Sequence, residues 1–279
     1  MLDLGITTVE CKSGYGLELA AELKQLQVYR DLRDLQPVDL VPTFLGAHMV
    51  PVEYEQDREA YIKLLCEDLI PEIGEKKLAR FCDVFVEQGA FSLEEASSIL
   101  RAASKAGLGL KVHADQLSNG GGAKLAATMG AVSAEHLEYT GADGIRALAR
   151  AGTVAVSLPL ASLYLCERYL PAREMLDAGV RVAVATDFNP GSAPSYHLPL
   201  AMTLACLNQK MTPQEVIMGA TTVAARAISA EKSIGSLLPG LAADIAVIDA
   251  PSVNHWLYHF RANACCGVIK SGRWERRLF

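Results

Sequence analysis

The sequence predicts an α/β fold of the (β/α)₈ TIM-type barrel class that lacks its first βα unit and carries the remnant of a small accessory β-sandwich at its C-terminus. Short apolar or β-branched runs alternate with helix-like segments seven times, a rhythm typical of a parallel sheet. Near residue 230 the rhythm stops, and two strand-like runs follow without a helix between them. With 51% hydrophobic and 21% charged residues, the 279-residue chain has the composition of a folded globular protein.

Each predicted strand is short and apolar, and each is followed by a segment whose apolar positions have helical spacing. The strands are residues 5–11, 38–46, 81–87, 109–114, 131–136, 153–158 and 180–187. The helices are residues 17–35, 57–69, 92–106, 122–129, 141–151 and 171–178, followed by 198–207 and 213–229. Barrel closure requires an eighth strand. Because the chain begins on a strand, we expect the remaining unit to lie before Met1.

The C-terminal tail has a different pattern. The runs "LLPGLAADIAVIDAP" and "CCGVIKSGRW" are predicted to be two strands, joined by an irregular loop that contains "HWLYHF". We therefore expect residues 1–230 to form the incomplete barrel and residues 231–279 to form a small accessory β layer.

Charge and cysteine usage exclude several classes of protein. The net charge of -6 and the absence of a clustered basic patch argue against a nucleic-acid partner. No apolar run reaches the roughly 18 residues of a membrane span, and the N-terminus does not resemble a signal peptide. The seven cysteines are odd in number and form no Cys-x-x-Cys pair, so neither a disulfide framework nor a thiolate zinc site is predicted. A cytoplasmic protein is the expectation.

Acid and imidazole side chains end several of the predicted strands. His113 and Asp115 follow one strand, His136 ends the next, Asp187 ends the last, and His48 comes just after the second. In a barrel the C-terminal ends of the strands meet at one mouth. Imidazoles and one or two carboxylates gathered there suit a divalent metal such as zinc or iron, with an open position for water.

Five ordered motifs make the chain resemble a known family. The motifs "ECKSGYGL", "FLGAHMVP", "VHADQLSNGGGAKLA", "SAEHLEYT" and "ATDFNPGSAP" are similar to those of the imidazolonepropionases, within the amidohydrolase superfamily. The tail "IGSLLPGLAADIAVIDA" resembles that superfamily's return to its accessory β-sandwich. The resemblance implies one zinc or iron ion and, often, a homodimer. It also implies a small-molecule substrate, 4-imidazolone-5-propanoate, which is hydrolysed to N-formimidoyl-L-glutamate in histidine degradation.

The same resemblance assigns roles to individual residues. His113 and Asp187 match metal ligands, and we interpret Asp187 also as the base that takes a proton from the attacking water. His136 matches an imidazole near the attacked carbonyl, where it would stabilise the developing oxyanion. Further residues match positions that contact the substrate: Tyr15, His48, Gln116, Asn189, Gly191 and Ser192.

The sequence departs from the superfamily pattern at three places. It contains no His-x-His pair, which normally ends the first strand and completes the metal site. Glu87 stands where dinuclear relatives have a carbamylated lysine, so a one-metal site is predicted. Gln116 is counted among the catalytic positions although some family members have Glu there, and a neutral amide cannot act as a base.

Two other functions remain open on the residues alone. One is a different metal-dependent cyclic amidohydrolase or a deaminase, which product analysis would separate, since deamination releases ammonia and this ring opening does not. The other is a noncatalytic barrel fragment or isoform, because the truncated chain holds two metal ligands in place of four and an incomplete ligand shell binds an ion weakly. The remaining histidines are interpreted as structural or surface residues: His197, His255 and His259.

Overall fold

The computed structural model describes residues 1–278, which divide into two compact units. The N-terminal unit is Val9–Thr153, and the C-terminal unit is Val154 onward together with Met1–Thr8. The predicted α/β fold with seven successive βα units is confirmed, because a helical segment follows each strand from β1 to β7. The predicted domain boundary at residue 230 stays a prediction.

A parallel sheet forms the centre of the N-terminal unit. Its strands run in the order β1-β2-β3-β4-β5, and β2 through β5 pair in parallel. Their bounds are β1 (Thr8–Lys12), β2 (Asp39–Ala47), β3 (Phe81–Val86), β4 (Gly109–Ala114) and β5 (Ser133–His136). The register pairs Phe85 with His113 and Ala114 with His136, so neighbouring strands end at nearly the same level.

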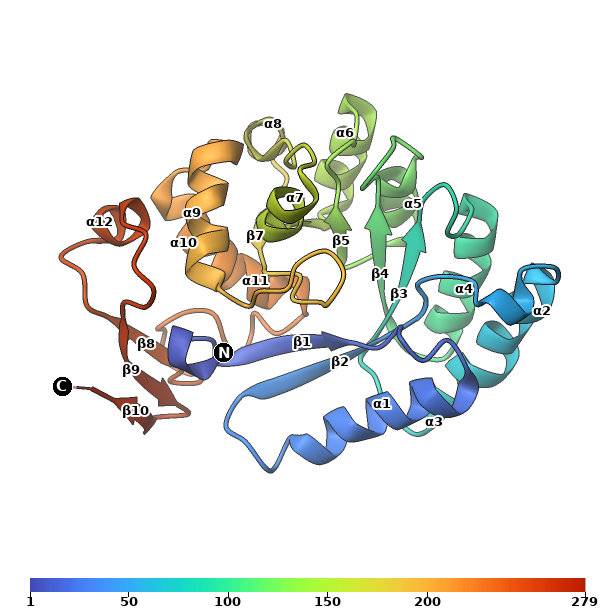
Figure 1. Ribbon diagram of the computed structural model, residues 1–279, viewed down its shortest axis with the longest axis horizontal. Helices are drawn as coiled ribbons and strands as arrows, with labels where there is room; N and C mark the ends of the chain where they lie inside the picture. The colour runs from blue at the N-terminus through green and yellow to red at the C-terminus, as the bar shows by residue number, and fades with distance from the viewer. Residues whose placement is uncertain (279) are drawn as a thin grey trace. The chain divides into compact units, whose positions relative to one another are not determined.

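Helices cover this sheet, and Figure 1 shows α1 lying alongside β2 and α4 beside β3. The helices are α1 (Leu19–Leu32), α2 (Arg58–Lys63), α3 (Ile70–Glu75), α4 (Leu93–Lys105), α5 (Gly122–Met129) and α6 (Ala142–Ala151), with a 3₁₀ turn η2 (Val52–Tyr54) and a π-helical segment η3 (Leu64–Leu69). Ser92 and Glu95 form a capping box that sets the start of α4. Tyr61 is fully buried and donates its hydroxyl to the carbonyl oxygen of Gly46 at 2.7 Å, which ties the helical layer to β2.

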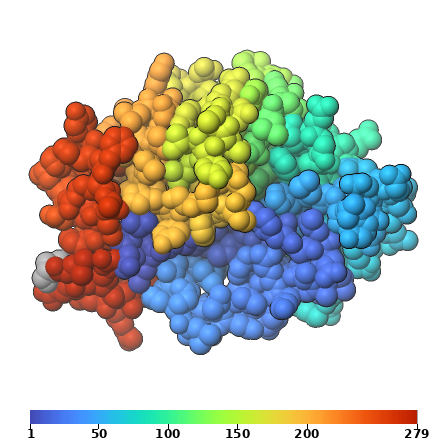
Figure 2. Space-filling view, viewed as in Figure 1, coloured from blue at the N-terminus to red at the C-terminus, as the bar shows by residue number. Residues whose placement is uncertain are grey.

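The C-terminal unit contains one parallel strand pair and one antiparallel sheet. Strands β6 (Val154–Ser157) and β7 (Val182–Val184) pair in parallel. The antiparallel sheet has the order β10-β9-β8, with β8 (Ile245–Ile248), β9 (Cys265–Lys270) and β10 (Arg273–Arg277). The helices are α7 (Pro159–Leu165), α8 (Ala172–Asp177), α9 (Leu198–Gln209), α10 (Pro213–Ala220), α11 (Thr222–Ala227) and α12 (Val253–Tyr258), together with the 3₁₀ turn η1 (Leu2–Leu4). In Figure 2 the segment from β8 to β10 forms one continuous red surface.

Several predicted elements need correction. The helix predicted over residues 213–229 is two helices, because the backbone breaks at Thr221 between α10 and α11. The loop predicted around "HWLYHF" begins with the short helix α12, and the tail holds three strands where two were predicted. Helix α7 was not predicted, and β7 is shorter than the predicted strand. Among the described helices, none combines the length and apolarity that a membrane crossing requires.

Candidate active site

Aromatic and imidazole rings form a row at the C-terminal ends of the strands in the N-terminal unit. The ring centroids of Tyr15 and His48 are 5.6 Å apart, and those of His48 and Phe85 are 6.1 Å apart. The row continues from Phe85 to His113 at 6.2 Å and from His113 to His136 at 5.2 Å. The structure therefore brings together four predicted site residues, and Phe85 is a fifth member that the sequence analysis missed.

His113 lies near the end of β4 and is held by an acid from β3. Its backbone N–H donates to Asp83 Oδ1 at 3.1 Å. Its ring nitrogen Nδ1 lies 2.9 Å from Asp83 Oδ2 and 3.6 Å from Glu135 Oε2, and neither contact has the linear geometry of an aligned hydrogen bond. A ligand nitrogen of His113 and one of His136 lie within 4.8 Å of each other. The two imidazoles are therefore close enough to act on one small group.

A buried network of charged side chains lies against His113. Lys12 Nζ is 2.7 Å from Asp83 Oδ2 and 3.0 Å from Glu10 Oε1. Lys111 Nζ is 3.0 Å from Glu10 Oε2 and 3.4 Å from Glu135 Oε1, and the side chain of Lys111 is fully buried. Strands β1, β3, β4 and β5 each contribute at least one member, so the network joins the inner faces of four strands.

The pKa shifts of Glu10, Asp83 and Lys12 favour the charged form of each group. Burial alone would raise the pKa of Glu10, but the ammonium groups of Lys111 and Lys12 lower it to about 2. Burial would also raise the pKa of Asp83, and the adjacent His113 and Lys12 instead hold it well below its usual range. Burial would lower the pKa of Lys12, whereas Asp83, Glu10 and Glu135 raise it well above the ordinary value. Removing one partner would leave a buried charge unpaired, which is costly.

The loop that carries Tyr15 is shaped by Glu22 of α1. The carboxylate of Glu22 is fully buried and accepts the backbone N–H groups of Gly14, Gly16 and Leu17 at 2.8–3.1 Å. Gly14 has φ +107°, and a Cβ there would meet the carbonyl oxygen of Leu45 at 2.6 Å, so only glycine fits. Glu22 was missed by the sequence analysis because it lies inside an ordinary helical segment.

His48 is fixed by the same loop. Its Nδ1 lies 3.1 Å from the carbonyl oxygen of Gly14, which can only accept, so Nδ1 is the donor. Glu22, Gly14 and the ring contact with Tyr15 thus place Tyr15 and His48 as a pair.

Asp115 does not join the ring row, which corrects the expectation that it converges with the histidines. Its carboxylate accepts the N–H groups of Gly122 at 3.0 Å and Ala123 at 3.3 Å, and the hydroxyl of Thr140 at 2.8 Å. Asp115 therefore caps the start of α5, and its carboxylate accepts hydrogen bonds within the protein.

Glu87 holds the loop that follows His113. Its carboxylate accepts the N–H groups of Leu117 at 2.9 Å and Ser118 at 3.2 Å, and the hydroxyl of Ser118. Burial would raise the pKa of Glu87, but these hydrogen bonds lower it. Gln116 is half-buried at the start of this loop. The carboxylate of Glu87 is therefore occupied as a hydrogen-bond acceptor within the protein.

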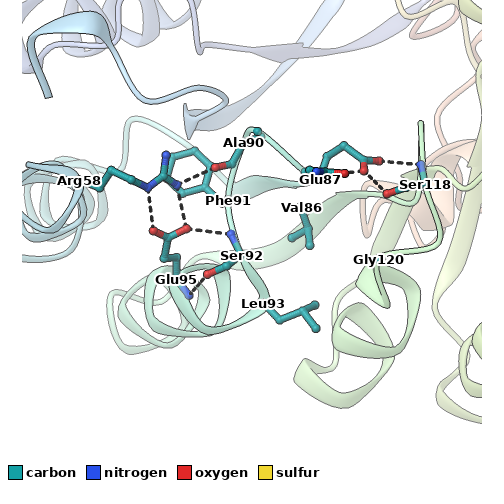
Figure 3. Close-up of a pocket in the computed structure, with 12 residues that line it drawn as sticks. Arg58, Val86, Glu87, Ala90, Phe91, Ser92, Leu93, Glu95, Ser118 and Gly120 are labelled. Atoms are coloured by element: carbon teal, nitrogen blue, oxygen red, sulfur yellow. Dashed lines mark hydrogen bonds and ion pairs between the residues drawn. The ribbon is translucent and has the colours of Figure 1, made fainter. Parts of the chain in front are cut away.

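A pocket of about 420 Å³ opens beside Glu87. Figure 3 shows Glu87 reaching Ser118 on one side, while Arg58 joins Glu95 and the carbonyl oxygen of Ala90 on the other. Because these charged groups already pair within the protein, we do not assign the pocket to a ligand.

The predicted site residues of the C-terminal unit share one loop after β7. The amide nitrogen Nδ2 of Asn189 donates to the backbone carbonyl of Asp187 at 2.6 Å and lies 3.2 Å from its Oδ2. The amide oxygen of Asn189 accepts the N–H groups of Gly191 at 2.8 Å and Ser192 at 2.7 Å. Asn189 thus organises the loop that presents Asp187.

Left-handed backbone conformations mark these strand ends. The φ angles are 72° at His136, 68° at Leu137 and 54° at Asp187. For residues other than glycine this conformation costs roughly 1–2 kcal/mol, and such strain concentrates at functional sites.

His197 caps α9 by accepting the N–H of Leu200 at 3.0 Å, in agreement with its predicted structural role.

Comparison with known proteins identifies the class. Residues 12–274 match the amidohydrolase family. The chain belongs to the amidohydrolase family, as the resemblance predicted. Its curated relatives include an imidazolonepropionase from Alkaliphilus metalliredigens, which is 45% identical over 98% of this chain and 65% of the relative. Another, from Fusobacterium nucleatum, is 48% identical over 98% of this chain and 66% of the relative. The chain thus spans just under two thirds of the length of these relatives.

Solved structures share the fold at low sequence identity. An adenosine deaminase from Xanthomonas campestris with bound zinc has a TM-score of 0.74 and 16% identity, covering 99% of this chain and 67% of that one. The atrazine chlorohydrolase TrzN from Arthrobacter aurescens, complexed with zinc, has a TM-score of 0.77 and 17% identity, covering 98% of this chain and 69% of that one. These similarities confirm the predicted TIM-type α/β fold.

Proposed function

We propose that the chain carries the catalytic residues of an imidazolonepropionase, which hydrolyses the ring C–N bond of 4-imidazolone-5-propanoate to N-formimidoyl-L-glutamate. The observation that carries the proposal is the row of Tyr15, His48, His113 and His136 at the strand ends of a chain 45–48% identical to proteins of that name. In this row the rings of Tyr15 and His48 can contact a planar substrate. The imidazoles of His113 and His136 are suited to binding a metal and stabilising an oxyanion.

We assign a single divalent metal to the site, with His113 and Asp187 as its ligands from this chain. The donor set fits zinc or iron, which bind neutral imidazole together with carboxylate. His113 supports the fit because its Nδ1 faces two buried carboxylates, which leaves Nε2 as the ligand atom. When bound, the metal acts as a Lewis acid that polarises the ring carbonyl and makes water more acidic.

The protein side chains supply the remaining chemistry. Asp187 accepts the proton of the attacking water, and the N–H of Asn189 next to its Oδ2 orients that carboxylate. His136 stabilises negative charge on the carbonyl oxygen. Gln116 hydrogen-bonds the substrate without acting as a base, since its amide stays neutral. Gly191 and Ser192 belong to the loop that receives substrate, and Asn189 contributes to it chiefly by shaping it.

Product analysis tests this function. The metal-loaded chain is mixed with 4-imidazolone-5-propanoate, and loss of substrate absorbance is followed together with the mass of the product. We expect N-formimidoyl-L-glutamate without release of ammonia. Release of ammonia would identify a deaminase instead.

A substitution at Asp187 tests the assigned base. Asp187→Asn should lower kcat by at least about 100-fold with the fold retained, because a positioned general base contributes about 10² to 10⁴ in rate. Asp177→Asn is the matched control, since Asp177 is exposed and pairs only with Arg173 among the described ion pairs. Near-normal turnover in Asp187→Asn would contradict the assignment.

A chimera addresses the difference in length from the relatives. The N-terminal third of the Fusobacterium nucleatum relative is joined before this chain, and the same assay is repeated. If the chimera turns over substrate and loses that activity with Asp187→Asn, the residues of this chain perform the chemistry. A folded, metal-loaded chimera without turnover would refute the proposed function.

We further infer a cytoplasmic enzyme that acts as a homodimer and has no nucleic-acid or membrane partner. All seven cysteines are free thiols, which fits a reducing compartment. Light scattering during gel filtration measures the oligomeric state, and a monomeric mass would exclude the dimer.

A further inference from the structure

The carboxylate of Asp83 contacts His113 at two atoms. One carboxylate oxygen accepts the backbone N–H of His113 at 3.1 Å, and the other lies 2.9 Å from the ring nitrogen Nδ1. Asp83 is itself completely buried and is anchored by Lys12 at 2.7 Å. Its position is therefore set by the sheet, and it constrains both the backbone and the ring of His113.

The carboxylates around Nδ1 determine which ring nitrogen carries the proton. Asp83 Oδ2 and Glu135 Oε2 both face Nδ1, at 2.9 Å and 3.6 Å. Ionised carboxylates accept hydrogen bonds and cannot donate them. An unprotonated Nδ1 would place its lone-pair density close to two negative charges, whereas an N–H group there places positive partial charge beside them. The neutral ring therefore carries its proton on Nδ1 and its lone pair on Nε2.

The charge of the network favours a cation on the far side of the ring. Three carboxylates, from Glu10, Asp83 and Glu135, face only two ammonium groups, from Lys12 and Lys111. In their ordinary ionised forms these groups leave one surplus negative charge. Buried charges interact strongly because the surrounding dielectric is low, so positive charge bound at Nε2 is favoured.

The network is not itself a metal site. Asp83, His113 and Glu135 offer ligand atoms close together. However, the Lys12 ammonium is 2.7 Å from Asp83 and 3.8 Å from Glu135, so it already supplies the neutralising cation. A second cation placed among these atoms would be repelled at short range.

We propose that Asp83 is a positioning residue that locks His113 in its Nδ1–H tautomer and thereby makes Nε2 the nitrogen that binds the divalent metal. The proposal rests on the proposed function for the role of His113 as a ligand. Carboxylates that hold a ligand histidine in this way commonly account for about 10- to 100-fold in metal affinity. The sequence conceals the role, since Asp83 is one acid inside the apolar run "FCDVFV".

The first test reads the tautomer directly. The metal-free chain is labelled with ¹⁵N-histidine, and the ring nitrogens are observed by NMR at about pH 8, above the ordinary histidine pKa. His113→Gln assigns the signals by loss of one set. We expect a protonated Nδ1 and an unprotonated Nε2 for His113. Protonation of Nε2 of His113 in the unmutated chain would overturn the proposal.

The second test distinguishes the contact between Asp83 and His113 from the negative charge that Asp83 adds to the network. Zinc affinity is measured by competition with a chromophoric chelator for the unmutated chain, Asp83→Asn and Glu10→Gln. Both variants remove one negative charge from the same network, but Glu10 does not touch His113 in the described contacts. We expect Asp83→Asn to weaken zinc binding by about 10- to 100-fold and Glu10→Gln to weaken it far less. Equal losses, or no loss in Asp83→Asn, would overturn the positioning role.

Neither readout uses the proposed substrate. If the tautomer and the affinity difference are as expected and no imidazolonepropionate is consumed, the proposed function fails and the role of Asp83 stands. If substrate is consumed while His113 has the other tautomer, the role of Asp83 fails and the proposed function stands.

Discussion

A single buried carboxylate, Glu22, sets the position of the Tyr15 loop. It accepts three backbone N–H groups from residues on both sides of Tyr15, and it lies on the helix that follows. A charged acceptor binds such groups more strongly than a neutral one. The proposed contact of Tyr15 with substrate therefore depends on a residue that never touches the substrate.

Replacing Glu22 tests this dependence. Glu22→Gln should raise KM more than it lowers kcat and should reduce the free energy of unfolding by about 1–3 kcal/mol, because buried N–H groups lose their charged acceptor. Substrate kinetics and urea unfolding measure the two effects. Glu18→Gln is the matched control, since Glu18 is exposed on the same segment and makes no capping hydrogen bond. Equal KM values in the two variants would contradict the role of Glu22.

At the scale of single residues, the sequence predicted the side chains at the strand ends. It did not predict the buried carboxylates that hold those side chains in place. His48, His113 and His136 could be found because a parallel sheet brings its strand ends together. Asp115 was wrongly included, since the sequence does not reveal that its side chain turns back to α5. Asp83 was missed. The available signal was a charged residue inside each of several apolar strands, which is unusual for buried positions.

Ion pairs between side chains connect the strands, in addition to the backbone hydrogen bonds of the sheet. Glu10 on β1 and Lys111 on β4 meet at 3.0 Å, and Thr43 on β2 donates its hydroxyl to Glu10 at 2.5 Å. The cost of burying these groups is offset only while each has its partner. The sheet of the N-terminal unit should therefore be sensitive to acid.

The sign of this pH dependence follows from Glu10. Its pKa falls from 4.5 to about 2 on folding, so the folded chain binds fewer protons than the unfolded chain between these values. The contribution of Glu10 to stability is complete above about pH 4.5 and disappears as the pH falls toward about 2, for a total of up to about 3 kcal/mol. Asp83 has a lowered pKa and acts in the same direction.

Urea unfolding at a series of acid pH values measures this loss. Glu10→Gln should be less stable near neutral pH and should show a flatter dependence below about pH 4.5. Asp68→Asn serves as a control, since Asp68 is exposed on η3, outside the charged network. A slope in Glu10→Gln as steep as that of the unmutated chain would contradict the assignment.

Helices were predicted well where caps mark their ends and poorly where they are short. Helix α4 matches its predicted range to within one residue at each end, as the capping box at Ser92 allows. Helix α12 has six residues and its sequence reads as a loop, although Ser252 caps it. Helix α7 follows β6 almost at once and is mainly apolar, so no change of period separates it from the strand.

At the scale of the whole molecule, the chain divides into two compact units, and each unit contains predicted site residues. The N-terminal unit holds Tyr15, His48, His113, Gln116 and His136, and the C-terminal unit holds Asp187 with its loop. The sequence predicted the family, the seven βα units and the ring-bearing strand ends. It could not predict the division at Thr153, because the βα rhythm continues without a change across that point.

We propose His113 and Asp187 as ligands of one divalent metal ion, and metal stoichiometry tests this proposal most directly. The chain is loaded with zinc or iron, freed of excess ion and analysed for metal content, beside His113→Ala, Asp187→Ala and the exposed control His255→Ala. We expect one ion per chain, retained in His255→Ala and lost in both site variants. One ion per chain in all four proteins would contradict it.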